Sequence, residues 1–460
     1  MKFSNLTWTK AILLFAGFSA IVSSVFGQSD LGSPYSLFGP GLPSMRQTVT
    51  QAGMGGTGVA FSDPYRLNLI NPAAAAGHLE PIFEMSGLGS VSTFQSNSGS
   101  FENQSFTINN IGMAYPIKRG VWNLNLGLVP LTAKNYDFTS SEQTEQLGAF
   151  RSEYSGNGGI SQAYLGTAYK VYNKIDTANN VTALSLGVQG NFNFGPVNNL
   201  RRISFPDDPG AMGLSVRESF LVRSPSIEAG VQYQTNLIKR TMKRPRYLKL
   251  LVGAVYRFES SLSAERSNYV YNWRPTPAGN ESPRDTIFAS TGAKGSLNMP
   301  ATAIFGIGLD YVTDKRQRIR FGLDYSVKGW SDYSENFDDE VRTFDFRNSE
   351  KVSAGIEFTP NLGGQKMVER LEYRLGFRSV RTGLVVSGTA INDYGISFGL
   401  SLPVNFRRNL SQSRFSVSAE YGSYGTVENG LIREDYVRIM AGFSLTPHFR
   451  NRWFVKPKYD

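Results

Sequence analysis

The sequence predicts an all-β protein: a transmembrane antiparallel β-barrel of about fourteen strands, with an N-terminal plug inside its lumen. Three features of the 460-residue chain predict this fold. An apolar export signal opens the chain, a Gly/Pro-rich stretch follows it, and long segments of alternating apolar and polar residues make up the rest. Together these features are typical of bacterial outer-membrane barrels.

Residues 1–27 have the pattern of a signal peptide. Lys2 and Lys10 accompany a polar start, and residues 11–26 are mainly apolar. This run is shorter than the about 20 residues that a membrane-spanning helix needs. Val25 and Gly27 are small enough for the −3 and −1 positions of a cleavage site, so we expect cleavage before Gln28. An uncleaved N-terminal anchor is the alternative.

Residues 28–80 do not alternate, and Gly and Pro mark turns throughout them. We expect this segment to form a hatch inside the barrel, because its apolar residues need burial. Its first motif contains Gly53, Gly55 and Gly56. This run could also be read as a phosphate-binding loop, but it lacks the GK[ST] ending, and close packing of the backbone against the barrel wall is the better interpretation.

The remaining chain, residues 81–447, alternates with a period of two, which indicates strands with one apolar and one polar face. In residues 319–328, for example, Ile319, Phe321 and Leu323 share one face. Lipid offers the backbone no hydrogen-bond partner, so such a sheet must close into a barrel. A large soluble sandwich or propeller is the alternative, but the strands are longer than the usual 5–6 residues. The fourteen expected strands are 82–95, 104–117, 120–138, 150–172, 181–194, 214–233, 247–268, 297–313, 317–332, 342–358, 369–388, 391–405, 413–427 and 431–447.

Long connections are expected near residues 195–213, 235–246, 269–296 and 333–342, where they would supply outer-surface loops or the bases of such loops. Residues 448–460 form a basic C-terminal tail. The third strand contains Pro130, which cannot donate a hydrogen bond to a neighbouring strand. A bulge, bend or break in pairing is therefore expected at Val129, Pro130 and Leu131, and a harmless bulge near the rim is the alternative.

The order of these features resembles the FadL family of outer-membrane channels for long-chain fatty acids and hydrocarbons. The resemblance rests on the export signal, the run AGMGGTGVAFSD, the triplet Asn71, Pro72 and Ala73, and the fourteen strands. The opening SPYSLFGPG and the ending NRWFVKPKYD look like members from Bacteroidetes-type bacteria. The resemblance implies a plugged barrel in the outer membrane that passes hydrophobic small molecules by diffusion, with a lateral opening at the third strand. Similar PorV-like relatives serve instead as scaffolds or accessory subunits of protein secretion or assembly machines.

Composition argues against an enzyme. The chain has no Cys, so it lacks the residues for thiol chemistry and for Cys zinc sites. It has only two His, which is too few to favour a His-based triad or metal cluster. We therefore expect no cofactor and no metal. Carboxylates on the strands, such as Glu228, Glu357 and Glu420, would pair with arginines across the lumen. The same set includes Glu153 and Glu372 and the arginines Arg320, Arg374 and Arg378.

The formal charge of +10 does not indicate nucleic-acid binding, because the basic residues are spread singly through the strands. Removal of Lys2 and Lys10 leaves 45 basic against 37 acidic residues, a charge of +8. The expected partners are a hydrophobic small molecule, outer-membrane lipid and other proteins of the envelope, without nucleic acid.

We predict that Gln28 is the first residue of the mature protein, because small residues precede it after an apolar run. N-terminal sequencing of protein extracted from membranes should begin at Gln28 or at its cyclised form. A chain that begins at Met1 would show that the segment is retained.

Overall fold

The computed structural model describes residues 32–447 with gaps at 98, 145–147, 209, 242–243, 277–280, 339, 365 and 405–411. The expected signal peptide, its cleavage site and the C-terminal tail 448–460 lie outside the described residues. The described chain is almost entirely strand, with short helical turns between the strands. None of the helices in these ranges is long and apolar enough to cross a membrane.

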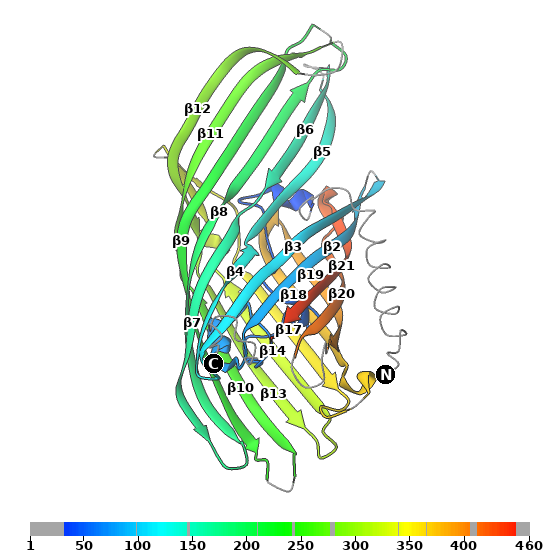
Figure 1. The fold of residues 1–460 in the computed structure, drawn as a ribbon. Coiled ribbons are helices and arrows are strands. Elements are labelled where there is room, and N and C mark those ends of the chain that lie inside the picture. Colours follow the sequence, from blue (N-terminus) through cyan, green and yellow to red (C-terminus); the bar gives the residue numbers. More distant parts are fainter. Residues whose placement is uncertain are drawn as a thin grey trace, which may run out of the picture.

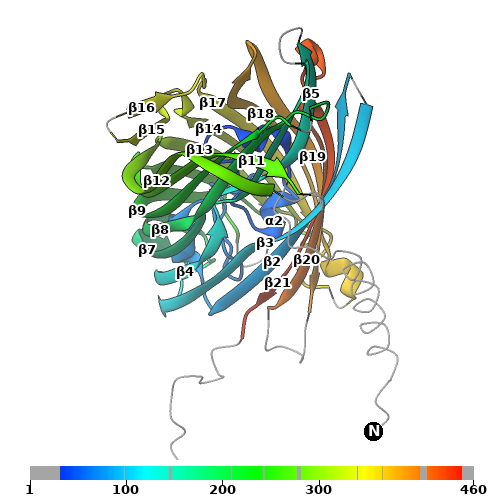
Figure 2. The same cartoon turned by 90° about the horizontal axis from the view of Figure 1, so that it is seen from above.

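Fourteen antiparallel strands close into a barrel (Figures 1 and 2). Each strand pairs with the next in the ring, and the last pairs with the first, from Phe83↔Leu445 to Gln95↔Arg433. The ring consists of β2 (Ile82–Ser96), β3 (Gly99–Lys118), β4 (Trp122–Pro130), β7 (Ser161–Ile175), β8 (Val181–Ser204), β9 (Gly213–Ile238), β10 (Tyr247–Arg257), β13 (Thr302–Val312), β14 (Arg318–Lys328), β17 (Ser349–Thr359), β18 (Glu372–Val386), β19 (Thr389–Pro403), β20 (Arg414–Gly425) and β21 (Arg433–Leu445).

Each of the fourteen expected segments contains one strand of this ring, in the expected order, so the predicted barrel is confirmed. The outward face of β4 shows why the alternation was informative. Trp122, Leu124 and Leu126 are exposed, whereas Asn123 and Asn125 between them are buried in the lumen. Apolar residues that face outward while polar residues face inward reverse the pattern of a soluble protein and match a lipid environment.

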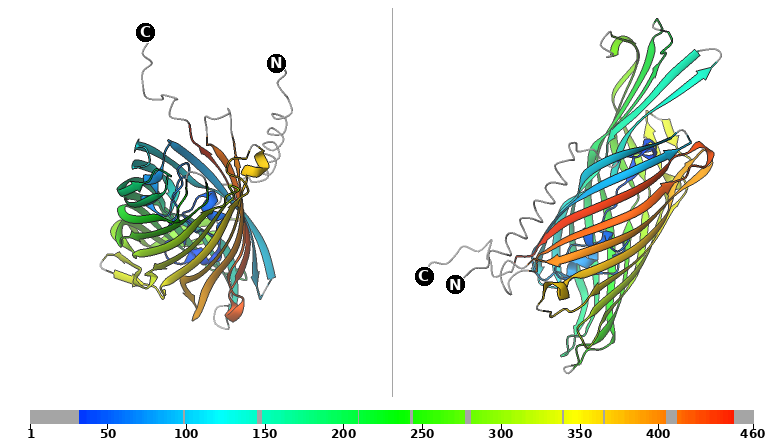
Figure 3. Two further views of the ribbon diagram at one scale, coloured as in Figure 1. Left: turned by 90° about the horizontal axis from the view of Figure 1, so that it is seen from below. Right: turned by 90° about the vertical axis from the view of Figure 1, so that its right-hand side faces the viewer.

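The same sheet extends beyond the barrel on one side, and this extension is called here the upper wall (Figure 1). The end of the barrel where β2 begins and β21 ends is called the base, and the wall rises from the opposite end (Figure 3). The upper wall contains the upper parts of β8 and β9 together with β5 (Thr132–Thr144), β6 (Gly148–Gly158), β11 (Ser260–Pro275), β12 (Glu281–Met299), β15 (Ser334–Phe337) and β16 (Glu340–Thr343).

The expectation of long loops at 195–213 and 269–296 was wrong, because β8, β9, β11 and β12 occupy most of both ranges. The residues around 333–342 likewise form β15 and β16. These strands lie beyond the apolar band of the barrel. Both of their faces carry polar residues, so the sequence shows little alternation of apolar and polar residues there. A cluster that contains Val222, Leu262 and Leu297 joins the wall to the barrel, and Trp330 of the turn η3 (Trp330–Asp332) packs into it.

The N-terminal segment, residues 32–81, folds as short turns rather than as a domain with its own sheet. It contains η1 (Pro34–Leu37), β1 (Leu42–Pro43), α2 (Val49–Ala52) and η2 (Pro72–Gly77). Thr48 caps α2 in a capping box with Gln51, which satisfies the first amides of this single turn. Met54, Val59 and Leu69 are buried, as their apolar character requires. In Figure 2 the ring of strands surrounds α2.

A row of glycines in the barrel wall faces this segment. Gly308, Gly322, Gly355 and Gly376 are direct cross-strand neighbours on β13, β14, β17 and β18. A Cβ atom on Gly376 would collide with the backbone nitrogen of Gly55, and one on Gly355 with the carbonyl oxygen of Met54. At Gly308 and Gly322 it would meet side-chain atoms of the segment instead. The wall therefore lacks side chains where the segment packs against it.

We predict that Gly376→Val destabilises the protein by at least the about 1–3 kcal/mol typical of overpacking, because a backbone atom occupies the space that the side chain needs. The midpoint of urea unfolding in detergent micelles measures this loss. Gly190→Val is the matched control, since a Cβ atom there meets only the carbonyl oxygen of Leu165 at 3.9 Å. Equal midpoints for the two variants would contradict the packing role of the row.

Candidate ligand cavity and wall break

The wall of the barrel breaks after Pro130. β4 pairs with β7 up to Pro130↔Ser161, whereas β5 pairs with β6 in the upper wall. The pairing between β3 and β4 stops at Ile111↔Leu128, so β5 leaves β3 and does not continue beside it (Figure 1). The backbone amides of Leu131 and Thr132 both donate to the carbonyl oxygen of Ile160, at 2.7 and 3.1 Å. A bulge, bend or break in pairing was expected at Val129, Pro130 and Leu131, and the structure shows a break in pairing there.

The chain also changes face at this point. Leu128 faces outward on β4, and Val129 is buried with 2% of its surface exposed. If the same alternation continued, Lys134 would face outward, but it is buried at 1% exposure. Its ammonium donates to the carbonyl oxygens of Leu37 and Gly39 and to Asn199, at 3.2, 2.9 and 2.8 Å. The break thus turns a charged side chain of β5 inward.

Part of the N-terminal segment fills the break from the lumen side. β1 pairs with β5 through Leu42↔Ala133 and Pro43↔Thr132. The Ser44 amide then donates to the carbonyl oxygen of Leu131 at 3.0 Å. On the opposite side, the Asn109 side-chain amide of β3 donates to the carbonyl oxygen of Gln47 at 2.8 Å. Residues 42–47 therefore contact both edges of the break.

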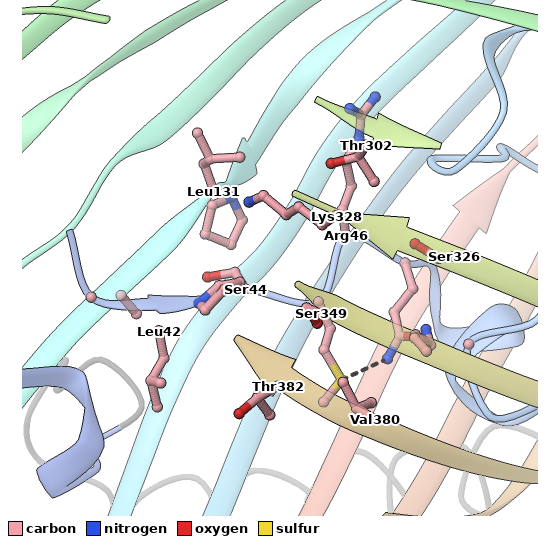
Figure 4. Close-up of a pocket in the computed structure, with 18 of the residues that line it drawn as sticks. Leu42, Ser44, Arg46, Leu131, Thr302, Ser326, Lys328, Ser349, Val380 and Thr382 are labelled. Atoms are coloured by element: carbon pink, nitrogen blue, oxygen red, sulfur yellow. Dashed lines mark hydrogen bonds between the residues drawn. The ribbon is translucent and has the colours of Figure 1, made fainter. Parts of the chain in front are cut away.

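A cavity of about 410 Å³ lies directly behind these residues. Pro130 and Leu131 line it beside the break, and Leu262, Met299 and Ile304 line its apolar side. Figure 4 shows Leu131, Leu42 and Ser44 facing the same space as Arg46 and Lys328. The cavity therefore combines apolar, polar and charged lining residues with direct contact with the break.

The charged groups in the cavity are predominantly cationic near β14. Arg46 binds Glu228 with two hydrogen bonds, at 2.7 and 3.0 Å, and Arg257 shares the same carboxylate at 2.9 Å. The Lys328 ammonium lies 3.9 Å from the centre of the Trp330 ring. It has no ion pair with the part of the chain that the structure describes. Three cations thus lie on this side of the cavity, and Glu228 pairs with two of them, Arg46 and Arg257.

Closer to the base, ion pairs join the N-terminal segment to the wall. Arg66 donates to both oxygens of Glu372 at 2.5 Å and to Glu357 at 3.4 Å. Burial opposes ionisation of Asp63, but Arg66 and Arg320 outweigh it and hold the pKa of this carboxyl well below its usual value. The expected pairing of strand carboxylates with arginines is confirmed, since the lumen also holds the pairs Arg320–Glu357, Arg374–Glu357, Arg374–Glu372 and Arg378–Glu420, and the upper wall holds Arg202–Glu153.

The glycine motif lies against β18 and β19. The Gly55 amide donates to the Ser397 hydroxyl at 2.9 Å, and Gly53 lies 2.9 Å from Gly399, measured from an ideal Cβ position. Gly56, like Gly55, has a positive φ, so these two positions favour glycine. This arrangement is a backbone turn packed on the wall.

The Asn-Pro-Ala triplet lies across the barrel, against β8 and β9. The Asn71 side chain accepts from the Ala73 amide at 3.0 Å and donates to the carbonyl oxygens of Val59 and Val231. Pro72 begins η2, where its missing amide donor costs nothing. The structure therefore brings Val129, Pro130 and Leu131 to the cavity, while both N-terminal motifs serve contacts with the wall.

Sequence reasoning missed the cations that matter most at this site. Arg46 and Arg66 are the two basic residues of segment 28–80, and both are buried in ion pairs with strand carboxylates. A charged residue in a segment expected inside a barrel needs a partner, so these residues could have been singled out. Lys328 offered no such signal, because it ends a strand of ordinary alternation.

We predict that Arg66→Met destabilises the protein by about 3–5 kcal/mol, since it leaves the buried carboxylates Glu357 and Glu372 with one cation fewer. Urea unfolding measures the loss, and limited proteolysis should cut the N-terminal segment first. Arg381→Met is the control, because its pair with Glu350 is exposed and is worth about 0–1 kcal/mol. Similar stability for both variants would contradict the prediction.

Comparison with solved structures confirms the predicted FadL-type fold. A FadL homologue from Pseudomonas aeruginosa matches with a TM-score of 0.53 at 13% identity, over 88% of this chain and 98% of that chain. A deltaS2 mutant of the TodX monoaromatic hydrocarbon channel matches with a TM-score of 0.53 at 15% identity, over 88% of this chain and 99% of that chain. No curated protein matches the sequence. The model of the BamG family matches residues 9–460, and the chain therefore belongs to the BamG family.

Proposed function

We propose that the protein is an outer-membrane channel that binds hydrophobic small molecules in the cavity and passes them through the wall break. One observation carries this proposal: the cavity and the break share Pro130 and Leu131. An apolar molecule that leaves sideways enters lipid directly and avoids the water above the barrel. The outward apolar face of the strands supports the membrane location.

The N-terminal segment acts in this proposal as the hatch of the channel. Its buried side chains and its ion pairs with the wall support a plug near the base. Residues 42–47 form the part that a ligand has to pass, because they contact both edges of the break. These contacts are a few hydrogen bonds, each worth about 0.5–1.5 kcal/mol net, so their rearrangement is energetically accessible.

Long-chain fatty acids fit the cavity better than neutral hydrocarbons do. Arg257 and Lys328 present positive charge to the part of the cavity that Leu262 and Met299 line, and only Glu228 pairs with the cations there. A buried charge is costly unless an opposite charge accompanies it. A carboxylate head group beside Lys328, with its apolar tail along Met299 and Leu262, would supply the missing charge.

We predict that a disulfide between Gln47→Cys and Asn109→Cys slows uptake of a fluorescent long-chain fatty acid into proteoliposomes at least tenfold. The bond would hold residues 42–47 in the break, and a reductant should restore the rate. The chain has no Cys of its own, so no other disulfide forms. The control is Leu309→Cys with Phe321→Cys, a cross-strand pair in the continuous wall. Uptake at the unmodified rate with the disulfide formed would exclude this route.

We predict that Lys328→Met weakens binding of palmitate at least tenfold, a change of about 1.4 kcal/mol, and leaves binding of hexadecane unchanged. The head-group charge is the difference between the two ligands, so the comparison isolates the role of the ammonium. Calorimetric titration of the purified barrel measures both affinities. If palmitate binding is unaffected, the cations do not recognise a head group, and a neutral ligand is indicated.

A second candidate function is a scaffold or accessory subunit of an outer-membrane secretion or assembly machine. The upper wall favours it, because a small-molecule channel does not need a sheet of this height. Ile287 and Phe288 of β12 are 58% and 51% exposed on that wall, beyond the barrel ring. Exposed apolar side chains on a wall that stands in water favour contact with another protein.

Isolation from native membranes in mild detergent tests this second function. A scaffold should retain other envelope proteins in fixed stoichiometry, and Ile287→Ser with Phe288→Ser should release them while palmitate binding persists. A protein that purifies alone and binds palmitate would instead support the channel.

A further inference from the structure

The part of β3 above the break has a neighbouring strand on one side only. Ser105–Asn110 lie in β3, which pairs with β2 from Gly99 to Ala114 with a bulge at Asn109. β4 reaches β3 only from Ile111 onward. Within the described ranges, no other strand pairs with Ser105–Asn110, and no backbone hydrogen bond joins the N-terminal segment to them. Six residues of strand, about 20 Å long, thus form an edge within a barrel.

This edge lacks most of the usual protection against pairing. Natural sheets shield their edges with charged residues, proline, bulges or very short strands. The other edges of the wall follow that rule: β16 has four residues, including Glu340 and Arg342, and β5 carries Asp137 and Glu142. Ser105–Asn110 contain neither a charged residue nor a proline. A bulge at Asn109 marks the point where pairing with β4 begins.

β5 is engaged in the upper wall and does not return to β3. It pairs with β6 from Lys134↔Gly158 to Thr144↔Gly148, and with β1 through Leu42↔Ala133 and Pro43↔Thr132. The Lys134 ammonium adds three hydrogen bonds there, to Leu37, Gly39 and Asn199. Closure of the break by β5 would lose these contacts, so β5 is not available to pair with Ser105–Asn110.

We propose that Ser105–Asn110 bind a β-strand of another outer-membrane protein by edge-to-edge pairing. In the membrane, unpaired backbone groups cost several kcal/mol each, so the occupant has to be an extended backbone. Its side chains have to continue the two faces of β3. Ile108 is 43% exposed on the lipid side, and Ser105 is buried on the lumen side. The fitting partner is therefore an uncharged strand with apolar residues on one face and small polar residues on the other.

Cysteine cross-linking tests this proposal on the full mature chain, which has no native Cys. The probe is a synthetic peptide with the sequence of residues 184–194, LSLGVQGNFNF, which is uncharged and alternates as required. A series of peptides carries Cys at successive positions. Paired strands place every second side chain on the same face. Thr107→Cys should form disulfides with alternate peptide positions, and Ile108→Cys with the intervening set.

Met113→Cys is the matched control, because this residue of β3 already has β2 on one side and β4 on the other. We expect at least a tenfold lower yield there and with a peptide of scrambled order. Equal yields at Ile108 and Met113, or yields without a period of two, would overturn the proposal. So would a disulfide between two copies of Ile108→Cys without peptide, since the edge would then serve self-association. The readout does not involve fatty-acid uptake, so this result is independent of the channel function.

Discussion

The hydrogen bonds of the backbone are the constraint on which this structure depends. Lipid provides no partner for an amide or a carbonyl, so a membrane sheet has to close on itself. Fourteen strands satisfy this requirement along most of the ring, including the contact of β21 with β2. At Pro130 the ring opens, and Ile160 and Ser44 take over the bonds that a neighbouring strand would have made. The N-terminal segment therefore contributes to the wall as well as to the lumen.

Charge in the lumen imposes a second requirement that links the same parts. Arg46 and Arg66 come from the N-terminal segment, and Glu228 and Glu372 come from the wall. Neither member of these pairs could remain buried alone, because an unpaired charge in a low-dielectric interior is strongly destabilising. The glycine row lets the backbone of the segment lie against the strands, so that these pairs can form. Packing and electrostatics thus position the segment together.

The sequence allowed the barrel to be predicted because lipid imposes a strict alternation on each strand. β4 illustrates this, with leucines outward and asparagines inward. The upper wall was not predicted, because water on both sides of β12 permits polar residues at every position. Pro130 indicated where the ring opens, since its ring removes a donor. The change of face that buries Lys134 depends on contacts with Leu37, Gly39 and Asn199, which no local pattern contains.

The two sides of the break differ in their backbone hydrogen bonds, and this difference indicates which side has a functional role. On the β5 side, β1 pairs with Thr132 and Ala133, and Ser33 donates to the carbonyl oxygen of Asn135. On the β3 side, the N-terminal segment meets the side chain of Asn109. A sequence selected only for stability would pair both sides, because each orphaned group in the membrane costs several kcal/mol. The chain instead leaves backbone groups of β3 without a partner strand, at the edge that borders both the cavity and the surrounding lipid. A strand that binds at that edge would therefore stabilise the structure more than one at the β5 side.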